Sequence, residues 1–393
     1  MKYINNGKDL TVYLEGRIDT NNAAETEKAI IAALEEYPES VPEFDLSSLE
    51  YISSAGLRVM MKMCRRFGTK LKAVNASPEV YDIFEVTGFT ELMNVEKRLR
   101  ELSVDGCEVI GTGFYGTVYR IDPETIVKVY QSPECLPIIQ NERKLAKLAF
   151  VKGVPTAISY DIVKVGDSYG TVFELLNAQS FNDMLRSEPE NFDDIMRKYV
   201  DFLKVVHSAE MDPGTLPFAR DVFLRYADEL RGCLTDDQCA RLKELFGALP
   251  DDLHMVHGDY QMKNVMMVGG EPMLIDMDTL SVGQPIFDLQ ALYVTYVAFP
   301  EDDPDNFMNF LGIPDELGKR IWQVILENYF DTKDKALLAD INDKIQLIAS
   351  VRFLYILNGS DLRNSDLGAL RIKHSQEHIT ELLGRVDSLE INV

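Results

Sequence analysis

The chain has 393 residues, of which 46% are hydrophobic and 26% charged, so length and composition predict a globular protein of two or three domains. A net charge of −24 argues against direct binding to nucleic acid. No apolar run is long enough for a secretory signal or a membrane span, and the five cysteines include no CxxC pair. We therefore expect a cytoplasmic chain with reduced thiols and no membrane partner.

Residues 1–100 alternate between strand-like and helix-like patterns. Leu10, Val12 and Leu14 alternate with polar neighbours, which is the period of a half-buried strand. Apolar residues then recur at spacings of three and four over residues 23–37, which predicts a helix. Further strands are expected near residues 43–46 and 71–74, with another helix starting at Ser77-Pro78. This alternation predicts an α/β domain over residues 1–100.

One serine in this domain lies where the sequence predicts that a strand passes directly into a helix. The stretch from Asp45 to Leu57 reads DLSSLEYISSAGL, and it places Ser54 near the start of the helix. Free N–H groups and the helix dipole favour negative charge there. Ser54 is therefore either an ordinary capping serine or a site for a phosphate.

The stretch around Ser54, with residues 16–30 before it and 77–93 after it, resembles the STAS domain of anti-sigma-factor antagonists. The resemblance covers nearly all of residues 1–100. It implies that Ser54 is a regulatory phosphorylation site and that the domain docks a protein partner. The family often has Asp before this serine, whereas this chain has Ser53. A phosphate would add about −1.5 to −2 charges to the docking surface.

A glycine-rich segment follows the first domain. Gly111, Gly113 and Gly116 have the spacing G-x-G-x-x-G-x-V, and glycines let a backbone approach and cradle phosphate oxygens. Dinucleotide-binding folds use the same spacing, but there the glycines lead into a helix. Residues 117–121 are β-rich instead. This favours a hairpin folded over a nucleotide, as in kinases.

A lysine and a glutamate come next in the order that a kinase-like fold requires. Lys128 lies in the strand-like segment 125–130, where it is either a solvated edge charge or the lysine that contacts the α- and β-phosphates. The expected partner is a glutamate on the next helix. Glu142 is the better candidate and Glu134 the alternative.

The strongest motif is the H-x-D-x4-N spacing from His257 to Asn264. In a kinase catalytic loop, Asp259 would orient and deprotonate an acceptor hydroxyl and Asn264 would ligate magnesium. Asp276 ends an apolar strand twelve residues later and is the second expected metal ligand. We therefore expect ATP and Mg²⁺ as cofactors.

Neighbouring residues have simpler explanations. His257 is expected to support the loop backbone, and Asp288 is expected to anchor the loop without touching substrate. Asp278 is either a further metal ligand or a surface acid. His374 and His378 have a spacing that can hold a metal, but no third ligand is evident nearby, so we expect them to be solvated.

The motifs HGD, IDMD and G-x-P-x-x-D-L resemble the aminoglycoside/choline phosphotransferase branch of the kinase-like superfamily. The likeness covers about residues 105–370. It implies a kinase-like domain over residues 101–393, with an amino lobe over about 105–176 and a helical carboxy lobe over about 177–393. A hinge near 173–176 would contact the nucleotide through Glu174 and Leu176. The expected fold class is an α/β STAS domain plus an α+β two-lobed protein-kinase-like domain.

These features predict an enzyme, an ATP- and Mg-dependent phosphotransferase that acts on the hydroxyl of an unidentified small molecule. The acidic chain suits an amine-containing acceptor. One alternative is a signalling kinase that phosphorylates a STAS serine, either Ser54 in cis or a serine of a partner. Another is a nucleotide-binding pseudokinase. Its one support is Gln261, at a position where the family commonly has His or Lys.

Overall fold

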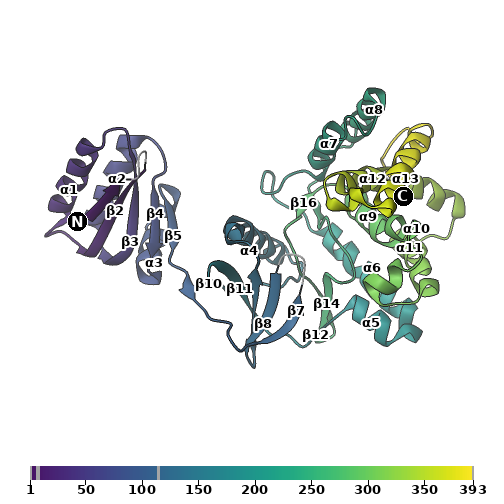
Figure 1. The fold of residues 1–393 in the computed structure, drawn as a ribbon, viewed down its shortest axis with the longest axis horizontal. Coiled ribbons are helices and arrows are strands. Elements are labelled where there is room, and N and C mark those ends of the chain that lie inside the picture. Colours follow the sequence, from purple (N-terminus) through teal and green to yellow (C-terminus); the bar gives the residue numbers. More distant parts are fainter. Residues whose placement is uncertain (1, 6–8, 113–115, 392–393) are drawn as a thin grey trace. The chain divides into compact units, whose positions relative to one another are not determined.

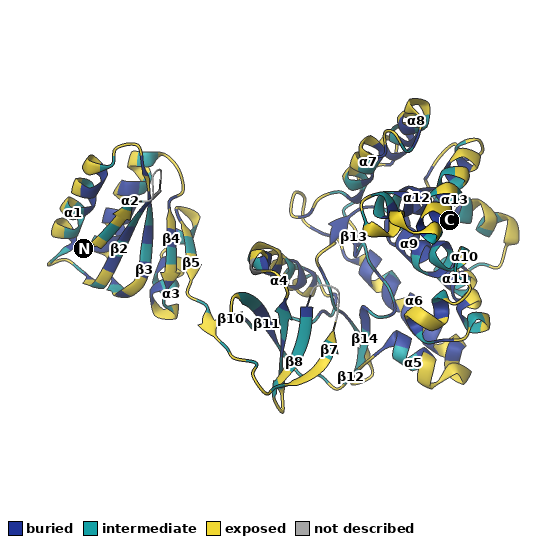
Figure 2. Cartoon of the chain, in the orientation of Figure 1, coloured by how far each residue is buried: buried dark blue, intermediate teal, exposed yellow. Residues whose placement is uncertain are grey.

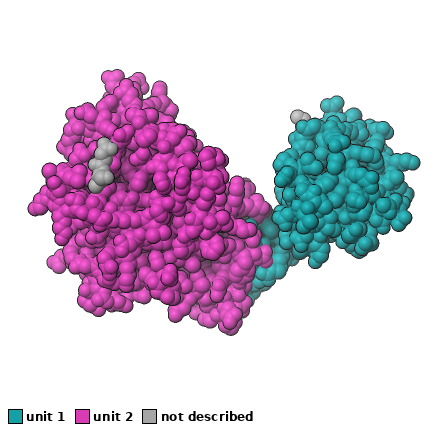
Figure 3. Space-filling model, turned by 180° about the vertical axis from the view of Figure 1, so that it is seen from behind, with its two compact units in different colours: residues 1–105, 162–170 teal, residues 106–161, 171–393 magenta. Residues whose placement is uncertain are grey.

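The computed structural model describes residues 2–5, 9–112 and 116–391. The chain forms two compact units, which Figure 3 distinguishes by colour. Unit 1 contains residues 1–105 and 162–170, and unit 2 contains residues 106–161 and 171–393. Each unit has its own hydrophobic core.

Unit 1 is built on a five-stranded sheet in the order β1-β2-β3-β4-β5, in which β1 is antiparallel to β2 and the other pairs are parallel. Helices follow β2, β3 and β4, so the predicted α/β alternation is confirmed (Figure 1). The elements are β1 (Lys2–Asn5), β2 (Asp9–Ile18), α1 (Ala23–Glu36), β3 (Val41–Ile52), α2 (Ser54–Phe67), β4 (Lys72–Ala76), α3 (Pro78–Val86), η1 (Phe89–Glu91) and β5 (Asn94–Lys97).

The core of unit 1 follows the sequence pattern. Leu10, Val12 and Leu14 of β2 are all buried, and the polar residues between them are more exposed. Helix α3 starts as expected, because the Ser77 side chain accepts a hydrogen bond from the Val80 N–H. Strand β3 is much longer than its hydrophobic signal suggested, because it pairs with β2 along almost its whole length.

Unit 1 also contains a segment from far along the chain. The short strand β6 (Arg100–Glu101) pairs in parallel with β10 (Asp161–Val165), through Val163 and Lys164. A further hydrogen bond runs from the Leu102 N–H to the Lys164 carbonyl. The expected boundary at residue 100 did not include this segment.

Unit 2 begins with a hairpin. Strand β7 (Glu108–Thr112) is antiparallel to β8 (Gly116–Asp122), and β8 is antiparallel to β9 (Thr125–Tyr130). A Cβ at Gly116 would lie 2.2 Å from the Val129 carbonyl oxygen, so only glycine allows this close approach of the two strands. The glycine-rich segment therefore leads into a strand, as the kinase-like interpretation predicted.

Strand β11 (Ser168–Glu174) lies next to β9 in the same sheet. The remaining elements are mostly helical, with short strands between them (Figure 1). They are η2 (Pro133–Cys135), α4 (Leu136–Val151), β12 (Ala178–Ser180), α5 (Phe181–Ser187), η3 (Pro189–Asn191), α6 (Phe192–Ser208), α7 (Ala219–Glu229), α8 (Asp236–Gly247), β13 (Met255–Val256), β14 (Val265–Val268), β15 (Glu271–Leu274), β16 (Ser281–Val282), α9 (Ile286–Tyr293), η4 (Val294–Ala298), α10 (Phe299–Glu301), η5 (Phe307–Leu311), α11 (Asp315–Tyr329), α12 (Lys335–Asn358), η6 (Asp361–Asn364) and α13 (Asp366–Leu383).

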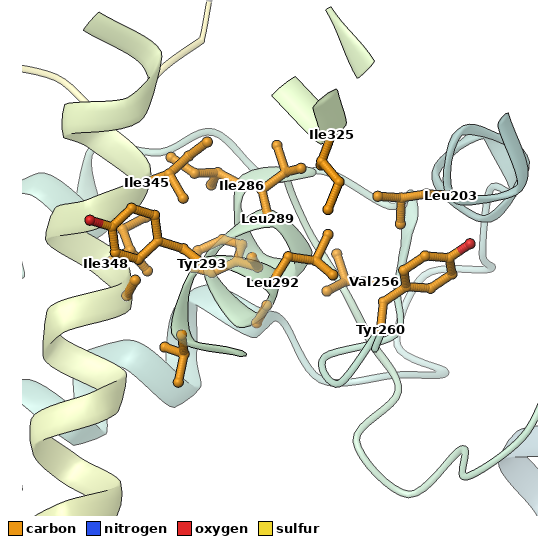
Figure 4. Packing of buried hydrophobic residues seen from close by; sticks show 14 of the residues in the cluster. Leu203, Val256, Tyr260, Ile286, Leu289, Leu292, Tyr293, Ile325, Ile345 and Ile348 are labelled. Atoms are coloured by element: carbon orange, nitrogen blue, oxygen red, sulfur yellow. The ribbon is translucent and has the colours of Figure 1, made fainter. Parts of the chain in front are cut away.

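Helix α9 lies at the centre of the unit 2 core. All eight of its residues are buried, which is visible as a dark segment in Figure 2. Figure 4 shows Leu289 and Leu292 of α9 packed near Ile325 of α11 and Ile345 of α12. A helix that is apolar on all sides is stable only when it is enclosed in this way. Its one acidic residue, Asp288, is therefore held inside the protein.

His374 and His378 face acids rather than solvent alone: His374 Nδ1 lies 2.7 Å from Asp302 and His378 Nε2 lies 3.3 Å from Glu301. These contacts link α13 to the end of α10 and correct the expectation of solvated histidines. Within the described ranges, no helix is both long and apolar enough to cross a membrane.

Candidate active site

A buried carboxylate supports the loop between β13 and β14. Asp288 has no exposed surface, and it accepts hydrogen bonds from the backbone N–H of His257 at 2.8 Å and of Gly258 at 2.6 Å. Its Oδ2 also lies 2.9 Å from His207 Nε2. Burial opposes the charge of Asp288, but hydrogen bonds from the His207 side chain and the His257 backbone help to lower its pKa below the ordinary value. Asp288 thus anchors the loop, as predicted.

Two further groups fix the first residues of this loop. Arg352 of α12 donates to the Gly258 carbonyl at 2.7 Å, and the Thr279 hydroxyl donates to the His257 carbonyl at 2.7 Å. Gly258 has a φ of +85°, and a Cβ there would lie 2.8 Å from the Thr279 carbonyl oxygen. The glycine of the HGD motif is therefore required by the backbone.

Three tyrosines fix the rest of the loop. Tyr260 and Tyr199 each donate their hydroxyl to the backbone carbonyl of the other, at 2.8 and 2.9 Å. The Tyr296 hydroxyl accepts a hydrogen bond from the Met262 N–H at 3.0 Å. Tyr296 lies in η4, a π-helix, and such turns occur often at functional sites. Sequence reasoning missed Tyr199, Tyr296 and Arg352, because their patterns resemble those of ordinary core helices.

The carboxylate of Asp259 is oriented by two amide groups. Its Oδ2 accepts from Gln261 Nε2 at 2.9 Å and from Asn264 Nδ2 at 3.0 Å. Its Oδ1 accepts no hydrogen bond from the described residues and is free to accept a proton. Gln261, which departs from the family pattern, thus has a local role as a donor to Asp259.

A lysine of the amino-terminal sheet meets two acids from distant parts of unit 2. Lys128 Nζ lies 3.8 Å from Glu142 Oε1 and 3.3 Å from Asp276 Oδ1. Burial opposes its charge, but the carboxylate of Glu142, aided by that of Asp276, raises the pKa of Lys128. The Tyr130 hydroxyl holds Glu142 by donating to Oε2 at 2.9 Å. The alternative partner, Glu134, is exposed.

Two aspartates, Asp276 and Asp278, follow β15, and the first of them is the one that contacts Lys128. Asp276 has a φ of +64°, a left-handed conformation that costs free energy in a residue other than glycine and often marks a functional site. Asp278 is an exposed residue. Partial loss of hydration around its carboxylate, together with the charges of Asp276, Glu142 and Asp259, raises the pKa of Asp278 to about 6. The site thus holds more negative charge than its own cations balance.

This raised pKa predicts a pH-dependent change in stability. The ordinary value is 3.8, so ionisation of Asp278 opposes folding, and the penalty grows between about pH 4 and pH 6 and persists above that range. We expect Asp278→Asn to raise the midpoint of thermal unfolding of the metal-free protein above pH 7 and to leave it unchanged at pH 4. The fluorescence of Trp322, the one tryptophan of the chain, reports unfolding of unit 2. An equal gain at both pH values would refute the assignment.

The other residues predicted to contact the nucleotide are the three glycines of the hairpin segment and the two residues near the end of β11. Gly111 lies in β7 and Gly116 begins β8, whereas Gly113 lies outside the described residues. Glu174 is exposed at the end of β11, and Leu176 is half-buried just after it. The segment between them is tied to the β8–β9 turn, because the Leu175 N–H donates to the Glu124 carbonyl at 2.6 Å.

The structure distinguishes between the two serines at the start of α2. Ser53 is the cap, because its hydroxyl accepts from the Ala55 N–H at 3.2 Å. Ser54 is the first helical residue and its side chain is exposed. The interpretation of Ser54 as a capping residue is therefore wrong. A Cβ at Gly56 would lie 2.7 Å from the side chains of Ile18 and Ile52, so this glycine lets α2 approach the sheet closely.

A cavity of about 230 Å³ lies beside the Asp259 loop. Its walls are mainly apolar, with Asp278 and Arg352 as the charged members. The lining residues are Pro217, Ala219, Val222, Phe223, Tyr226, Val256, Gly258, Asp278, Thr279, Leu280, Ser281, Phe287, Gln290 and Arg352. The cavity is large enough for a small molecule or part of one.

Comparison with known protein families identifies both halves of the chain. Residues 106–315 match the family model described as "Phosphotransferase enzyme family". The chain belongs to this phosphotransferase family. Residues 2–102 match the STAS domain model, and 89 residues are 34% identical to "Putative anti-sigma factor antagonist BtrV" of Bordetella bronchiseptica, covering 22% of this chain and 76% of that protein. Both resemblances, and the expected fold class, are confirmed.

Solved structures of phosphotransferases are also similar to this chain. The streptomycin-ATP-APH(2")-IIa ternary complex has 16% identity and a TM-score of 0.46, over 70% of this chain and 92% of that one. A choline/ethanolamine kinase family protein from Mesorhizobium loti has 13% identity and a TM-score of 0.45, over 72% and 88%. Because the identities are below 25% and the TM-scores below 0.5, these likenesses support no statement about substrate.

Proposed function

We propose that this chain is an ATP- and Mg-dependent phosphotransferase that transfers the γ-phosphoryl group to a hydroxyl of a small molecule. The observation that carries the proposal is the contact between Lys128 and Asp276, which are 148 residues apart and lie 3.3 Å from each other next to Glu142. Such a cluster matches the requirement of phosphoryl transfer for a fixed cation and a metal-binding acid at one point. Membership of the phosphotransferase family supports it.

Each group then has a role in nucleotide binding. Lys128, oriented by Glu142, binds the α- and β-phosphates, and the hairpin glycines Gly111, Gly113 and Gly116 cover them. The segment after β11, from Glu174 to Leu176, contacts the base. These roles use a backbone that is already folded in the required direction, since β7 and β8 form the hairpin.

The acidic end of the site suits magnesium. Asn264 donates its Nδ2 to Asp259, which leaves Oδ1 without a hydrogen bond from the described residues and able to ligate a cation. Asp276 supplies carboxylate oxygen, and Asp278 supplies more once it ionises. The uncompensated negative charge noted above supports a cation here. When bound, Mg²⁺ neutralises charge on the β- and γ-phosphates.

The chemistry assigned to this chain's own residues is proton acceptance and positioning. Asp259 accepts the proton of the acceptor hydroxyl at Oδ1, while Gln261 and Asn264 hold Oδ2. The acceptor oxygen forms a bond to the γ-phosphorus as the bond to the β-phosphate oxygen breaks. The products are a phosphate monoester and ADP, and the proton remains on Asp259 until it passes to solvent.

The cavity beside the loop is the proposed acceptor site. It reaches Gly258, next to the base, and Asp278, next to the proposed metal ligands. Its apolar walls favour an acceptor with an apolar part, and its carboxylate suits an amine. We would incubate the chain with Mg²⁺ and radiolabelled ATP against a panel of amino alcohols, sugars and hydroxy acids. A labelled ester from any compound supports the proposal, and its absence across the panel and a metabolite extract contradicts it.

A second candidate is that the kinase-like unit phosphorylates a STAS serine. The observation that favours it is that Ser54 is exposed while Ser53 makes the cap, so the Ser54 hydroxyl is not needed by the helix. We expect intact-mass analysis after incubation with Mg-ATP to show one added phosphate on the wild type and none on Ser54→Ala. Ser53→Ala is the matched control and should still be modified. An unmodified wild type, in cis and with added STAS domain, would eliminate this candidate.

A further inference from the structure

A series of hydrogen bonds continues from the Asp259 loop through Asp288 and His207 to the end of α11. Asp288 holds the loop, and His207 of α6 holds Asp288 through Nε2 at 2.9 Å. The other ring nitrogen, Nδ1, lies 2.7 Å from the hydroxyl of Tyr329, the last residue of α11. Both His207 and Asp288 are buried, so water cannot take the place of a missing partner at low cost.

Only one proton arrangement satisfies every group when His207 is neutral. Asp288 already accepts two backbone N–H groups, and its carboxylate needs a donor at Nε2. Nδ1 is then a lone-pair acceptor, and the Tyr329 hydroxyl is the donor that it faces. The other neutral tautomer, with its proton on Nδ1, would point the Nε2 lone pair at the Asp288 carboxylate, which is repulsive. Tyr329 is thus placed to fix the orientation of the ring.

Tyr329, the outer end of this series of hydrogen bonds, is reachable from the surface. Tyr329 is half-buried and lines a cavity of about 340 Å³ together with Gln284, Pro285, Ile286, Phe330, Asp331 and Ile391. Lys204 lies above the Tyr329 ring, 6.0 Å from its centroid, and pairs with Asp331 at 2.7 Å. The tyrosine therefore connects a surface cavity to a buried carboxylate that supports the loop.

We infer that Tyr329 is a positioning residue of the Asp259 loop, acting through His207 and Asp288. Removing its hydroxyl leaves Nδ1 without a donor, loosens the ring and weakens the support of the His257 and Gly258 N–H groups. This inference rests on the proposed function for its effect on turnover, but its effect on the loop backbone does not depend on that function.

The test uses the full chain with Tyr329→Phe, which keeps the ring packed against His207 and Phe330, at centroid distances of 5.5 and 5.0 Å. We expect hydrogen exchange of the Gly258 amide to be about tenfold faster, and phosphotransfer about tenfold slower with the KM for ATP unchanged, as for one lost buried hydrogen bond. Ring ¹⁵N spectra, simple to assign with five histidines, should show the His207 proton on Nε2 in the wild type.

Small-molecule rescue separates the hydroxyl from the packing. Tyr329→Ala enlarges the cavity, so added phenol should restore slow Gly258 exchange and benzene should not. Wild-type exchange in Tyr329→Phe, equal rescue by benzene, or a wild-type His207 proton on Nδ1 would each overturn the inference. If Tyr329→Ala does not fold, the Tyr329→Phe result decides alone. The two proposals can fail separately. If the wild type shows no phosphotransfer but Tyr329→Phe still shows fast Gly258 exchange, the proposed function is rejected and the positioning role is kept.

Discussion

Replacing Asp259 by Asn is expected to lower phosphotransfer at least about hundredfold, because a positioned general base commonly contributes a factor of about 10² to 10⁴. The substitution keeps the shape of the side chain and removes its capacity to accept the proton. Affinity for Mg-ATP should change little, because the residues proposed to contact the nucleotide, Lys128, Glu142 and Asp276, are unaltered. Turnover is measured with the acceptor identified in the panel, and ATP affinity by calorimetry.

Asp387→Asn is the matched control for this substitution. It removes one charge from a fully exposed side chain whose nearest cation is Arg241 at 3.7 Å, and it should behave as the wild type. Wild-type turnover in Asp259→Asn would contradict the assignment of the base. Loss of ATP binding together with turnover would mean that Asp259 acts in holding the nucleotide instead.

Replacing Asp288 by Ala is expected to destabilise unit 2 by about 3–5 kcal/mol, the usual cost of removing one partner of a buried charged cluster. The change leaves two backbone N–H groups and His207 without their acceptor in a dry core. Urea unfolding followed by Trp322 fluorescence measures the effect. Trp322 is buried in α11, so the signal reports unit 2 and not the STAS domain.

A carboxylate in unit 1 provides the control for that experiment. Asp45 accepts a hydrogen bond from Asn75 at 2.8 Å and belongs to the other core. Asp45→Ala should leave the Trp322 transition in place. If Asp288→Ala shifts this transition by less than about 1 kcal/mol, comparable with one ordinary hydrogen bond, Asp288 is not the anchor described above.

Sequence reasoning succeeded where the signal is local. The spacing from His257 to Asn264 lies within one loop, and the hairpin of the glycine-rich segment followed from the β-rich residues after Gly116. The glutamate expected beside Lys128 was Glu142, which lies 3.8 Å from it, whereas the contact between Lys128 and Asp276 was not predicted.

The supporting groups could not be predicted in the same way. Arg352 reaches the Gly258 carbonyl from a helix 94 residues later, and its setting in the sequence is that of an interrupted hydrophobic helix. Tyr296 owes its place to a π-helix, which has no reliable sequence signature. The choice between Ser53 and Ser54 as cap depends on backbone angles: Ser53 is extended, with φ of −90° and ψ of 175°, so its hydroxyl can turn back to the helix.

The pairing of β6 with β10 is a further case. Two residues form the registered contact, and neither segment has a composition that marks it as part of the first unit. Long-range pairing of short strands depends on tertiary structure and not on local propensity. For the same reason, the sequence predicted a single boundary at residue 100 and did not predict that residues 162–170 belong to unit 1.

We propose that Lys128, Asn264 and Asp276 form a magnesium-dependent nucleotide site, and calorimetric titration of ATP tests this proposal without knowledge of the acceptor. We predict that the wild type binds ATP with Mg²⁺ present, that EDTA weakens binding at least about tenfold, and that Asp276→Asn weakens it similarly only when Mg²⁺ is present. ATP binding that is equal with and without metal, or no binding at all, would contradict the proposed magnesium-dependent nucleotide site.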